Sequence, residues 1–366
     1  MQRLRAVGVS SSVGCVMAMV GCATHGPVTD RPLPPDHPRV YTADHTSTPI
    51  LVDGLLDEPA WRRASWTADF IDIEGDTKPP PRHRTRAKMC WDDEYFYVAA
   101  ELDEPDLWGV LTNRDAIIYH DNDFEIFIDP DGDRCEYDEY EINVLGTEMD
   151  LRMSRPYRNG GNYDLTWDFE GVRSAISLRG TVNDPSNRDS GWTVEVAIPW
   201  SSMADTANVP CPPRARSTWW VNFSRVQWRS EVIEGRYQKI DGLREDNWVW
   251  SPQSAIDMHR PEYWGLVQFI ASEYGADGFS VPVDAAARSQ MRRLIAAVEQ
   301  YQSTHSHGPN TLSDLPIANQ LDANLPEPVV ASIDDRAVIV QRYRSPAGMR
   351  RLVCDEFGCL HDTESR

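Results

Sequence analysis

Short segments with period-two alternation recur from about Ile50 to Ile270, and this pattern constrains the fold more than any other feature of the chain. These segments are rich in β-branched and aromatic residues and are bounded by Asp, Gly, Asn or Pro: RTRAKMCW, EYFYVAAEL, DFEIFID, YEINVLG, GWTVEVAIPW, TWWVNFSRVQW and EYWGLVQFI. Alternating strands separated by turn residues are typical of antiparallel sheets with one apolar face. We therefore predict a mainly β fold, an antiparallel, jelly-roll-like β-sandwich over residues 50–271.

The composition changes after Gly278, where a helical pattern replaces the strands. Apolar residues at helical spacing form one stripe of a helix of about 20 residues, ended by a His-Gly-Pro sequence. The segments RAVIVQRYR and GMRRLVCD then favour a hairpin. We predict a linker over residues 272–283 and a small α+β appendage over residues 284–366, which packs beside the sandwich or binds a partner.

The N-terminus carries a targeting signal. Two arginines precede the apolar run AVGVSSSVGCVMAMVGC, which is the layout of a signal peptide. The run ends in MVGC, which resembles the lipobox of bacterial lipoproteins, so residues 1–22 are predicted to be a lipoprotein signal with Cys22 as the lipid attachment site. The alternative is an ordinary signal peptide in which Cys22 is incidental or Cys15 is used. The Pro-rich residues 23–49 are predicted to be a linker, in a protein exported to the periplasm or cell surface and anchored in a membrane.

The net charge and the cysteine content limit which partners, metal sites and disulfides we expect. The net charge of −21 and the pI near 4.8 argue against nucleic acid, whose binding needs clustered Lys and Arg. Five cysteines follow the signal, and none has the paired CxxC spacing of a zinc site. In an oxidising compartment Cys354 and Cys359 could close a small hairpin disulfide, and free thiols are the alternative.

The acidic sequence DPDGD carries a possible metal site. Its carboxylates, Asp129, Asp131 and Asp133, stand at alternate positions, as in a calcium loop, because calcium prefers several oxygen ligands. The same letters between two alternating strands also make a good β-turn. The sequence leaves open a turn alone or a turn that holds structural calcium.

Polar residues on two of the strands form a candidate site. Glu125 on DFEIFID, with Glu141 and Asn143 on YEINV, would come together on one polar face if the two strands pair. Glycoside hydrolysis needs two carboxylates across a bound sugar, which the sequence does not demonstrate, and no GxSxG, HExxH, P-loop or GxGxxG motif occurs in a supporting context.

Aromatic residues favour a carbohydrate ligand. Of the 13 Trp, several fall on polar-facing strand positions or in loops: Trp167, Trp220, Trp228, Trp248 and Trp250. The alternation of TWWVNFSRVQW places Asn222 on the same side as Trp220 and Trp228. Sugar rings stack on indole while amides and carboxylates bind the hydroxyls, and the alternative is that these indoles pack under covering loops.

Several motifs, in order, resemble the family 9 carbohydrate-binding modules and their relatives, the family 9-like domains. They are LVDGLLDEPAW, TRAKMCWDDEYFYVAAEL, NRDAIIYHDNDFEIFIDPDGD, YEINVLG, DSGWTVEVAIPW and WWVNFSRVQW, and they cover roughly residues 50–270. The resemblance implies a β-sandwich that binds sugars, often at a chain end. It also implies a sugar ring held between two Trp with Glu, Asn and Arg around it, and structural calcium.

Only some of the sugar-binding residues that the resemblance implies have a counterpart in this sequence. The resemblance places Glu125 at the sugar-contacting Glu and Tyr119 near one of the two Trp. Glu141 stands near the position of the binding Arg, and Met258 replaces the second Trp. As substitutes we consider Trp248 and Trp250 for the indole, and Arg114 for the guanidinium.

Three functions follow from the sequence. The first is non-catalytic binding of a polysaccharide or glycan end. The second is a structural or assembly lipoprotein that has lost sugar binding, and the third is a glycoside hydrolase. We expect no catalytic cofactor.

Overall fold

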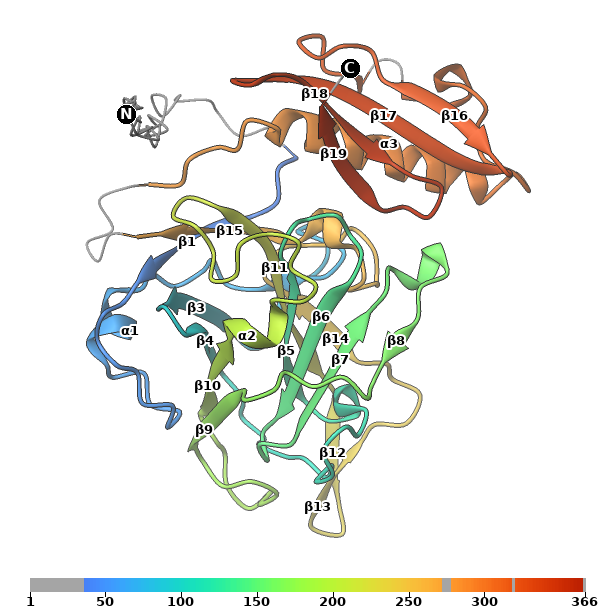
Figure 1. Cartoon of the computed structure of the whole chain (residues 1–366). Coiled ribbons are helices and arrows are strands. Elements are labelled where there is room, and N and C mark those ends of the chain that lie inside the picture. Colours follow the sequence, from blue (N-terminus) through green and yellow to red (C-terminus); the bar gives the residue numbers. More distant parts are fainter. Residues whose placement is uncertain (1–35, 272–277, 318–319, 365–366) are drawn as a thin grey trace, which may run out of the picture.

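The computed structural model describes residues 36–271, 278–317 and 320–364, in which strands predominate (Figure 1). The predicted signal peptide and Cys22 lie outside these residues. No helix in the described ranges combines the length and apolar character needed to cross a membrane.

One large sheet contains 13 strands. They are β1 (Val40–His45), β2 (Ile71–Asp72), β3 (Thr85–Trp91), β4 (Tyr95–Leu102), β5 (Asp123–Asp129), β6 (Tyr137–Asn143), β7 (Glu148–Met153), β8 (Tyr163–Asp164), β9 (Arg173–Arg179), β10 (Gly191–Pro199), β11 (Thr218–Gln227), β14 (Asp246–Val249) and β15 (Gly265–Ile270). The main path runs β8-β7-β6-β5-β11-β15-β1-β3-β4-β10-β9, with β14 and β2 attached beside β11. Two short helices, α1 (Pro59–Arg63) and α2 (Trp200–Met203), interrupt the strands where the sequence turns.

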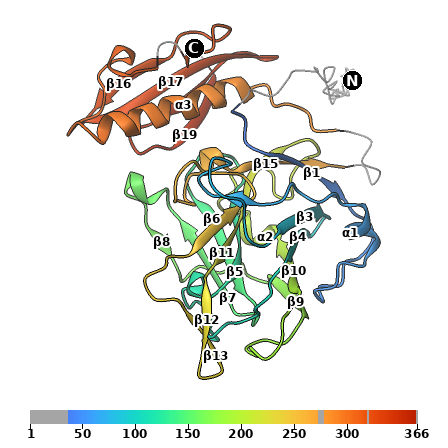
Figure 2. The ribbon, with the colours of Figure 1, turned by 180° about the vertical axis from the view of Figure 1, so that it is seen from behind.

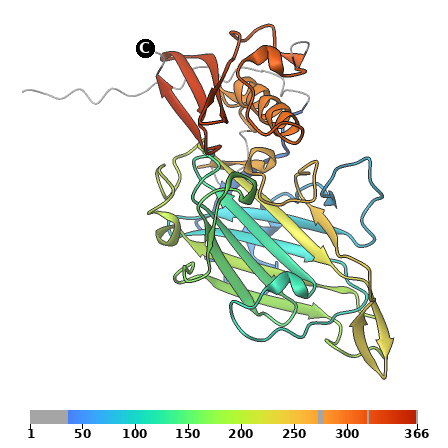
Figure 3. The same ribbon diagram turned by 90° about the vertical axis from the view of Figure 1, so that its right-hand side faces the viewer.

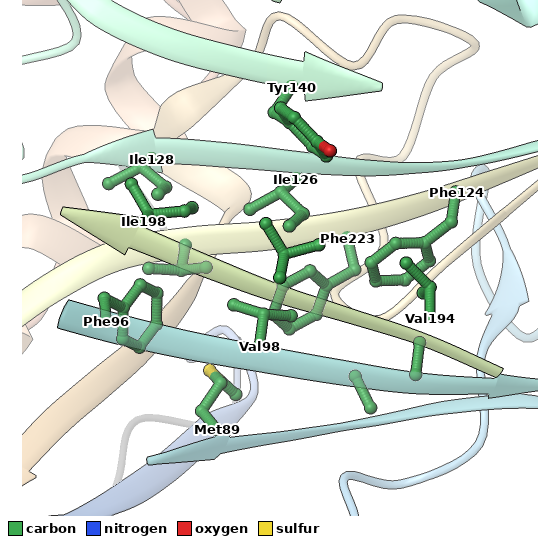
Figure 4. Close-up of a cluster of buried hydrophobic side chains, with 14 of the residues drawn as sticks. Met89, Phe96, Val98, Phe124, Ile126, Ile128, Tyr140, Val194, Ile198 and Phe223 are labelled. Carbon is green, nitrogen blue, oxygen red and sulfur yellow. The ribbon is translucent and has the colours of Figure 1, made fainter. Parts of the chain in front are cut away.

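The large sheet curls until its two halves face each other, which makes it a β-sandwich (Figures 1 and 3). Alternate residues of β5, such as Phe124 and Ile126, meet Val98 and Val194 from the opposite half (Figure 4). Phe223 of β11 lies among them, fully buried. The predicted period-two pattern therefore places one face of each strand in a shared apolar core, whose burial supplies most of the stabilising free energy.

The N-terminal strand differs from the prediction. Val40–His45 fall in the segment predicted to be a linker, yet they form β1, which pairs in parallel with β15 and with β3. Tyr41 and Ala43 of this strand are buried in the sandwich core. The pairing is therefore mixed rather than purely antiparallel, because a strand that enters from the N-terminus fills the gap between the two halves.

The C-terminal residues form a second layered unit (Figure 2). Its four-stranded antiparallel sheet consists of β16 (Val329–Ile333), β17 (Arg336–Ser345), β18 (Gly348–Cys354) and β19 (Leu360–Glu364), and the helix α3 (Ala285–Gln302) covers one face. Met291 and Leu294 lie in the shared core, as the helical stripe predicts, and the predicted hairpin is β17–β18.

A disulfide and several polar contacts join this unit to the sandwich. Cys135 bonds to Cys359, with their Cα atoms 5.7 Å apart. The predicted pairing of Cys354 with Cys359 is therefore wrong, because Cys354 points into the core under α3 as a free thiol. The Arg134 guanidinium also donates to the carbonyl of Gly358 at 2.8 Å.

Candidate functional site

A groove of about 590 Å³ lies on the outer face of β5, β6 and β7, on the opposite side of these strands from the sandwich core. Because side chains alternate along a strand, residues next to the core positions point outward. The register sets Glu125 opposite Glu141, and Phe127 opposite Glu139. On β7, Met149 pairs with Glu141 and Leu151 with Glu139. The floor of the groove is thus a block of carboxylates and apolar side chains in alternating rows.

Three exposed tyrosines stand around this floor. Tyr119 belongs to the 3₁₀ turn η1 (Ile118–His120), Tyr157 begins the turn η2 (Tyr157–Asn159), and Tyr163 lies on β8. Their exposed fractions are 41%, 47% and 53%. The rings of Tyr157 and Tyr163 lie edge to face, 6.3 Å apart. Aromatic faces at the rim of a concave site are suited to stacking on a flat ligand.

The groove carboxylates have few partners. The backbone N–H of Tyr119 donates to Glu141 Oε2 at 3.1 Å. His259 Nε2 lies 3.9 Å from Glu139 Oε2, and its Nδ1 is 3.0 Å from the Tyr137 hydroxyl. Glu139 Oε2 has no hydrogen-bond partner and is free to accept a hydrogen bond from a ligand.

Burial shifts the protonation of these groups. It raises the pKa of Glu125 to about 7 and that of Glu139 to about 8, and it raises the pKa of Glu141 well above its usual range. The same cause lowers the pKa of His259 to about 4. Desolvation disfavours the charged form of each group, so the groove holds protonatable carboxyls and a neutral imidazole near neutral pH.

Only some of the predicted site residues meet in the groove. Tyr119, Glu125 and Glu141 line it together, and Met258 stands on its wall. Glu139 was not predicted as a site residue, although it lies two residues before Glu141 and the alternation alone places both on one face. Tyr157, Tyr163 and His259 were also missed, because loop and edge positions carry no such periodicity.

Two predicted site residues lie elsewhere. The Asn143 side chain donates to the carbonyl of Leu111 and to Asp121, and its oxygen accepts two backbone N–H groups of the following turn, so it is a buried turn residue. The Arg114 guanidinium lies 2.7 Å from both Glu148 and Asp150 and belongs to a different hollow. Neither side chain is available to a sugar in the groove.

The predicted replacement of a missing indole by Trp248 or Trp250 is wrong. Both side chains are at most 3% exposed and belong to the sandwich core, because β14 pairs with β11 and turns its indoles inward. Asn222 is also buried and exchanges hydrogen bonds with the backbone of Ser251. The strand β11 is therefore covered on both faces, which its alternation alone did not indicate.

Trp228 does not line the groove but contacts the backbone of Tyr119, which does. Its indole N–H donates to the carbonyl of Tyr119 at 2.8 Å. The ammonium of Lys239 lies 3.5 Å from the centre of the indole ring, an arrangement that favours a cation–π interaction. The two contacts fix the position of the turn that carries Tyr119.

The DPDGD sequence forms the turn between β5 and β6. Asp129 accepts the backbone N–H groups of Gly132 and Arg134. Carboxylate oxygens of Asp129, Asp131 and Asp133 lie within 4.8 Å of one another. Gly132 has φ +67°, and a Cβ there would meet the Trp220 ring at 2.4 Å, so glycine is required. The donor set is all oxygen and fits calcium.

These features describe a β-sandwich with an acidic, tyrosine-lined groove on the outer face of one half. Within this chain, residues 52–211 match the family model described as "Carbohydrate family 9 binding domain-like". This part of the chain is therefore similar to that family.

Curated relatives resemble parts of the chain. Exoglucanase XynX of Acetivibrio thermocellus is 30% identical over 156 residues, which is 43% of this chain and 12% of the relative. Endo-1,4-beta-xylanase A of Thermoanaerobacterium saccharolyticum is 32% identical over 117 residues, or 32% and 8%. The chain thus spans about an eighth or less of the length of these two relatives.

Two solved structures are similar to part of the chain. A family 9 carbohydrate-binding module from Caldicellulosiruptor kristjanssonii in complex with cellotriose has 16% identity and a TM-score of 0.43, and the match covers 67% of this chain and all of that one. A putative carbohydrate-binding protein from Bacteroides uniformis has 15% identity and a TM-score of 0.47, with 63% and 99% covered.

Proposed function

We propose that the protein binds carbohydrate without transforming it, through the groove on β5, β6 and β7. The carrying observation is that three exposed tyrosines surround a floor of buried carboxylates. Sugar rings offer C–H faces to aromatic side chains and hydroxyl donors to carboxylates. The family match of residues 52–211 supports the same ligand class.

The placement of the carboxylates favours binding over hydrolysis. A glycosidase sets its acid and its second carboxylate on either side of the scissile bond. Glu125 and Glu141 are direct cross-strand neighbours on one face of the sheet, so both reach a bound ring from the same side. Incubation with oligosaccharides that bind should therefore release no new reducing ends, and steady release abolished by Glu125→Gln would contradict this part of the proposal.

A glycan array with the purified protein, followed by calorimetry on the oligosaccharides it retains, tests binding. We expect Tyr163→Ala and Tyr119→Ala each to weaken binding by about tenfold, because each removes a stacking face. Phe357→Ala, an exposed aromatic of the C-terminal unit, is the matched control and should bind like the wild type. Silence across plant, algal and bacterial glycans would overturn the proposal and favour a structural lipoprotein.

The proposal includes export and a lipid anchor at Cys22, supported by the signal-like N-terminal sequence. Radiolabelled palmitate should enter the wild-type protein but not a Cys22→Ser variant expressed in a lipoprotein-processing bacterium. Labelling of both proteins would place the lipid elsewhere, and labelling of neither would leave an ordinary signal peptide.

It also includes structural calcium at Asp129, Asp131 and Asp133. The all-oxygen donor set and the required glycine support this assignment. Calcium there would hold the turn that joins β5 to β6, next to the disulfide at Cys135, and would take no part in chemistry.

A further inference from the structure

Four carboxylates lie together on this face of β5 and β6, and three of them, Glu125, Glu139 and Glu141, line the groove. Glu125 and Glu141 face each other across β5 and β6, and Asp123 and Glu139 lie two residues before them on the same face. Oxygens of Asp123, Glu125 and Glu141 lie within 4.8 Å of one another. None of the four residues is more than 5% exposed, and burial raises the pKa of each carboxyl. The cluster is therefore only partly ionised near neutral pH, and a bound cation would favour its ionised form.

The described part of the chain offers little positive charge beside this cluster, although Lys239 interacts electrostatically with Asp123. Across residues 36–271, 278–317 and 320–364, no lysine or arginine forms an ion pair with any of the four carboxylates. His259 approaches Glu139 to 3.9 Å, but burial lowers its pKa to about 4, so it is neutral at pH 7. Arg244 is on the groove wall, yet its side chain is 58% exposed and its guanidinium pairs with Glu245.

Two oxygens of the cluster have no hydrogen-bond partner. They are Asp123 Oδ2 and Glu139 Oε2, both buried, and the Glu139 side chain lines the groove. Buried acceptors in proteins are almost always satisfied, and leaving a charged one unsatisfied is costly. A ligand group that donates hydrogen bonds and carries a positive charge would satisfy these acceptor oxygens and would stabilise the ionised form of the carboxylates.

Resting on the proposed function, we propose that the groove binds a positively charged saccharide, a 2-amino-2-deoxy sugar whose ammonium lies among Glu125, Glu139 and Glu141. An ammonium offers three N–H donors, and its hydrogen bonds to carboxylates are charge-assisted. The pyranose ring then packs between the tyrosines. An N-acetylated sugar lacks the charge, and a uronate is repelled by the same carboxylates.

Calorimetry on the full-length protein tests this with equal-length oligosaccharides of glucosamine, N-acetylglucosamine and glucose. We expect the glucosamine oligomer to bind at least about tenfold more tightly than the other two and to weaken as salt is added. Glu139→Gln and Glu141→Gln should each remove most of this preference while the fold, checked by unfolding midpoint, is retained. Glu231→Gln, on the exposed hairpin β12 (Ser230–Ile233), is the matched control and should keep the preference.

The outcomes separate this inference from the function on which it rests. Equal or tighter binding of the glucose oligomer overturns the amino-sugar assignment and leaves carbohydrate binding intact. Failure of all three oligomers, and of a glycan array, overturns both. Calcium alone, bound with an affinity that Glu139→Gln or Glu141→Gln reduces, also overturns the assignment, because a metal would then be the missing cation.

Discussion

Replacing Glu125 by Gln should make the protein more stable at high pH, which is unusual for the loss of a carboxylate. The side chain is 4% exposed, and burial raises its pKa from 4.5 to about 7. Between these values the folded protein holds a proton that the unfolded chain has released, so stability falls as pH rises through this window. At about 1.36 kcal/mol per pKa unit, the ionised side chain costs the fold about 3 kcal/mol above pH 7.

Denaturant unfolding followed by tryptophan fluorescence measures this effect. At about pH 4 the variant and the wild type should unfold with nearly equal free energies, because Glu125 is then largely protonated in both the folded and the unfolded chain. At about pH 8 the Glu125→Gln protein should be more stable by about 3 kcal/mol, since the amide keeps the shape and removes the charge. Glu231→Gln should change neither value. A difference that stays constant with pH, or a variant less stable at pH 8, would refute the reasoning.

Three further predictions concern the sandwich core, the disulfide and the proposed calcium site. Phe223→Ala should cost about 3–5 kcal/mol in unfolding free energy, measured with denaturant, because it opens a cavity in the sandwich core; a loss below about 1 kcal/mol would mean that the core collapses around the gap. Cys359→Ser should lower stability by about 2–5 kcal/mol and expose the C-terminal unit to limited proteolysis, and an unchanged digestion pattern would mean that its polar contacts suffice. Calcium should raise the melting temperature in differential scanning fluorimetry, chelation should reverse the rise, and Asp131→Asn should reduce it; equal shifts in both proteins would place the ion elsewhere.

The sequence predicted the fold class and the two core-forming patterns well, because each depends on local periodicity. The alternation of DFEIFID indicates that Phe124 and Ile126 enter the core, and they do. The helical stripe around Met291 likewise faces the C-terminal sheet. Such patterns report which face of an element is buried, and this information lies within a few residues.

The site was harder to predict because it depends on which segments cover which faces. Polar-facing indoles such as Trp248 looked available to a ligand, yet the pairing of β14 with β11 buries them. Tyr157 and Tyr163 reach the groove from a turn and a short edge strand, where no alternation marks them. The disulfide of Cys135 joins residues separated by 224 positions, a distance over which spacing rules carry no information.

The parallel strand β1 has a mechanical consequence. A pull applied to the chain before Asp36 loads the contacts of Asp36 with Ser289 and Arg293 of α3 and the strand β1, whose hydrogen bonds to β15 and β3 run across the strand direction. Such a load stretches the bonds together in shear, whereas a hairpin pulled open at its end loses them one after another. If the protein were held at its N-terminus while its groove bound a polymer, tension between these two points would load the pairing of β1 in shear, which resists force better than the opening of a hairpin from its end.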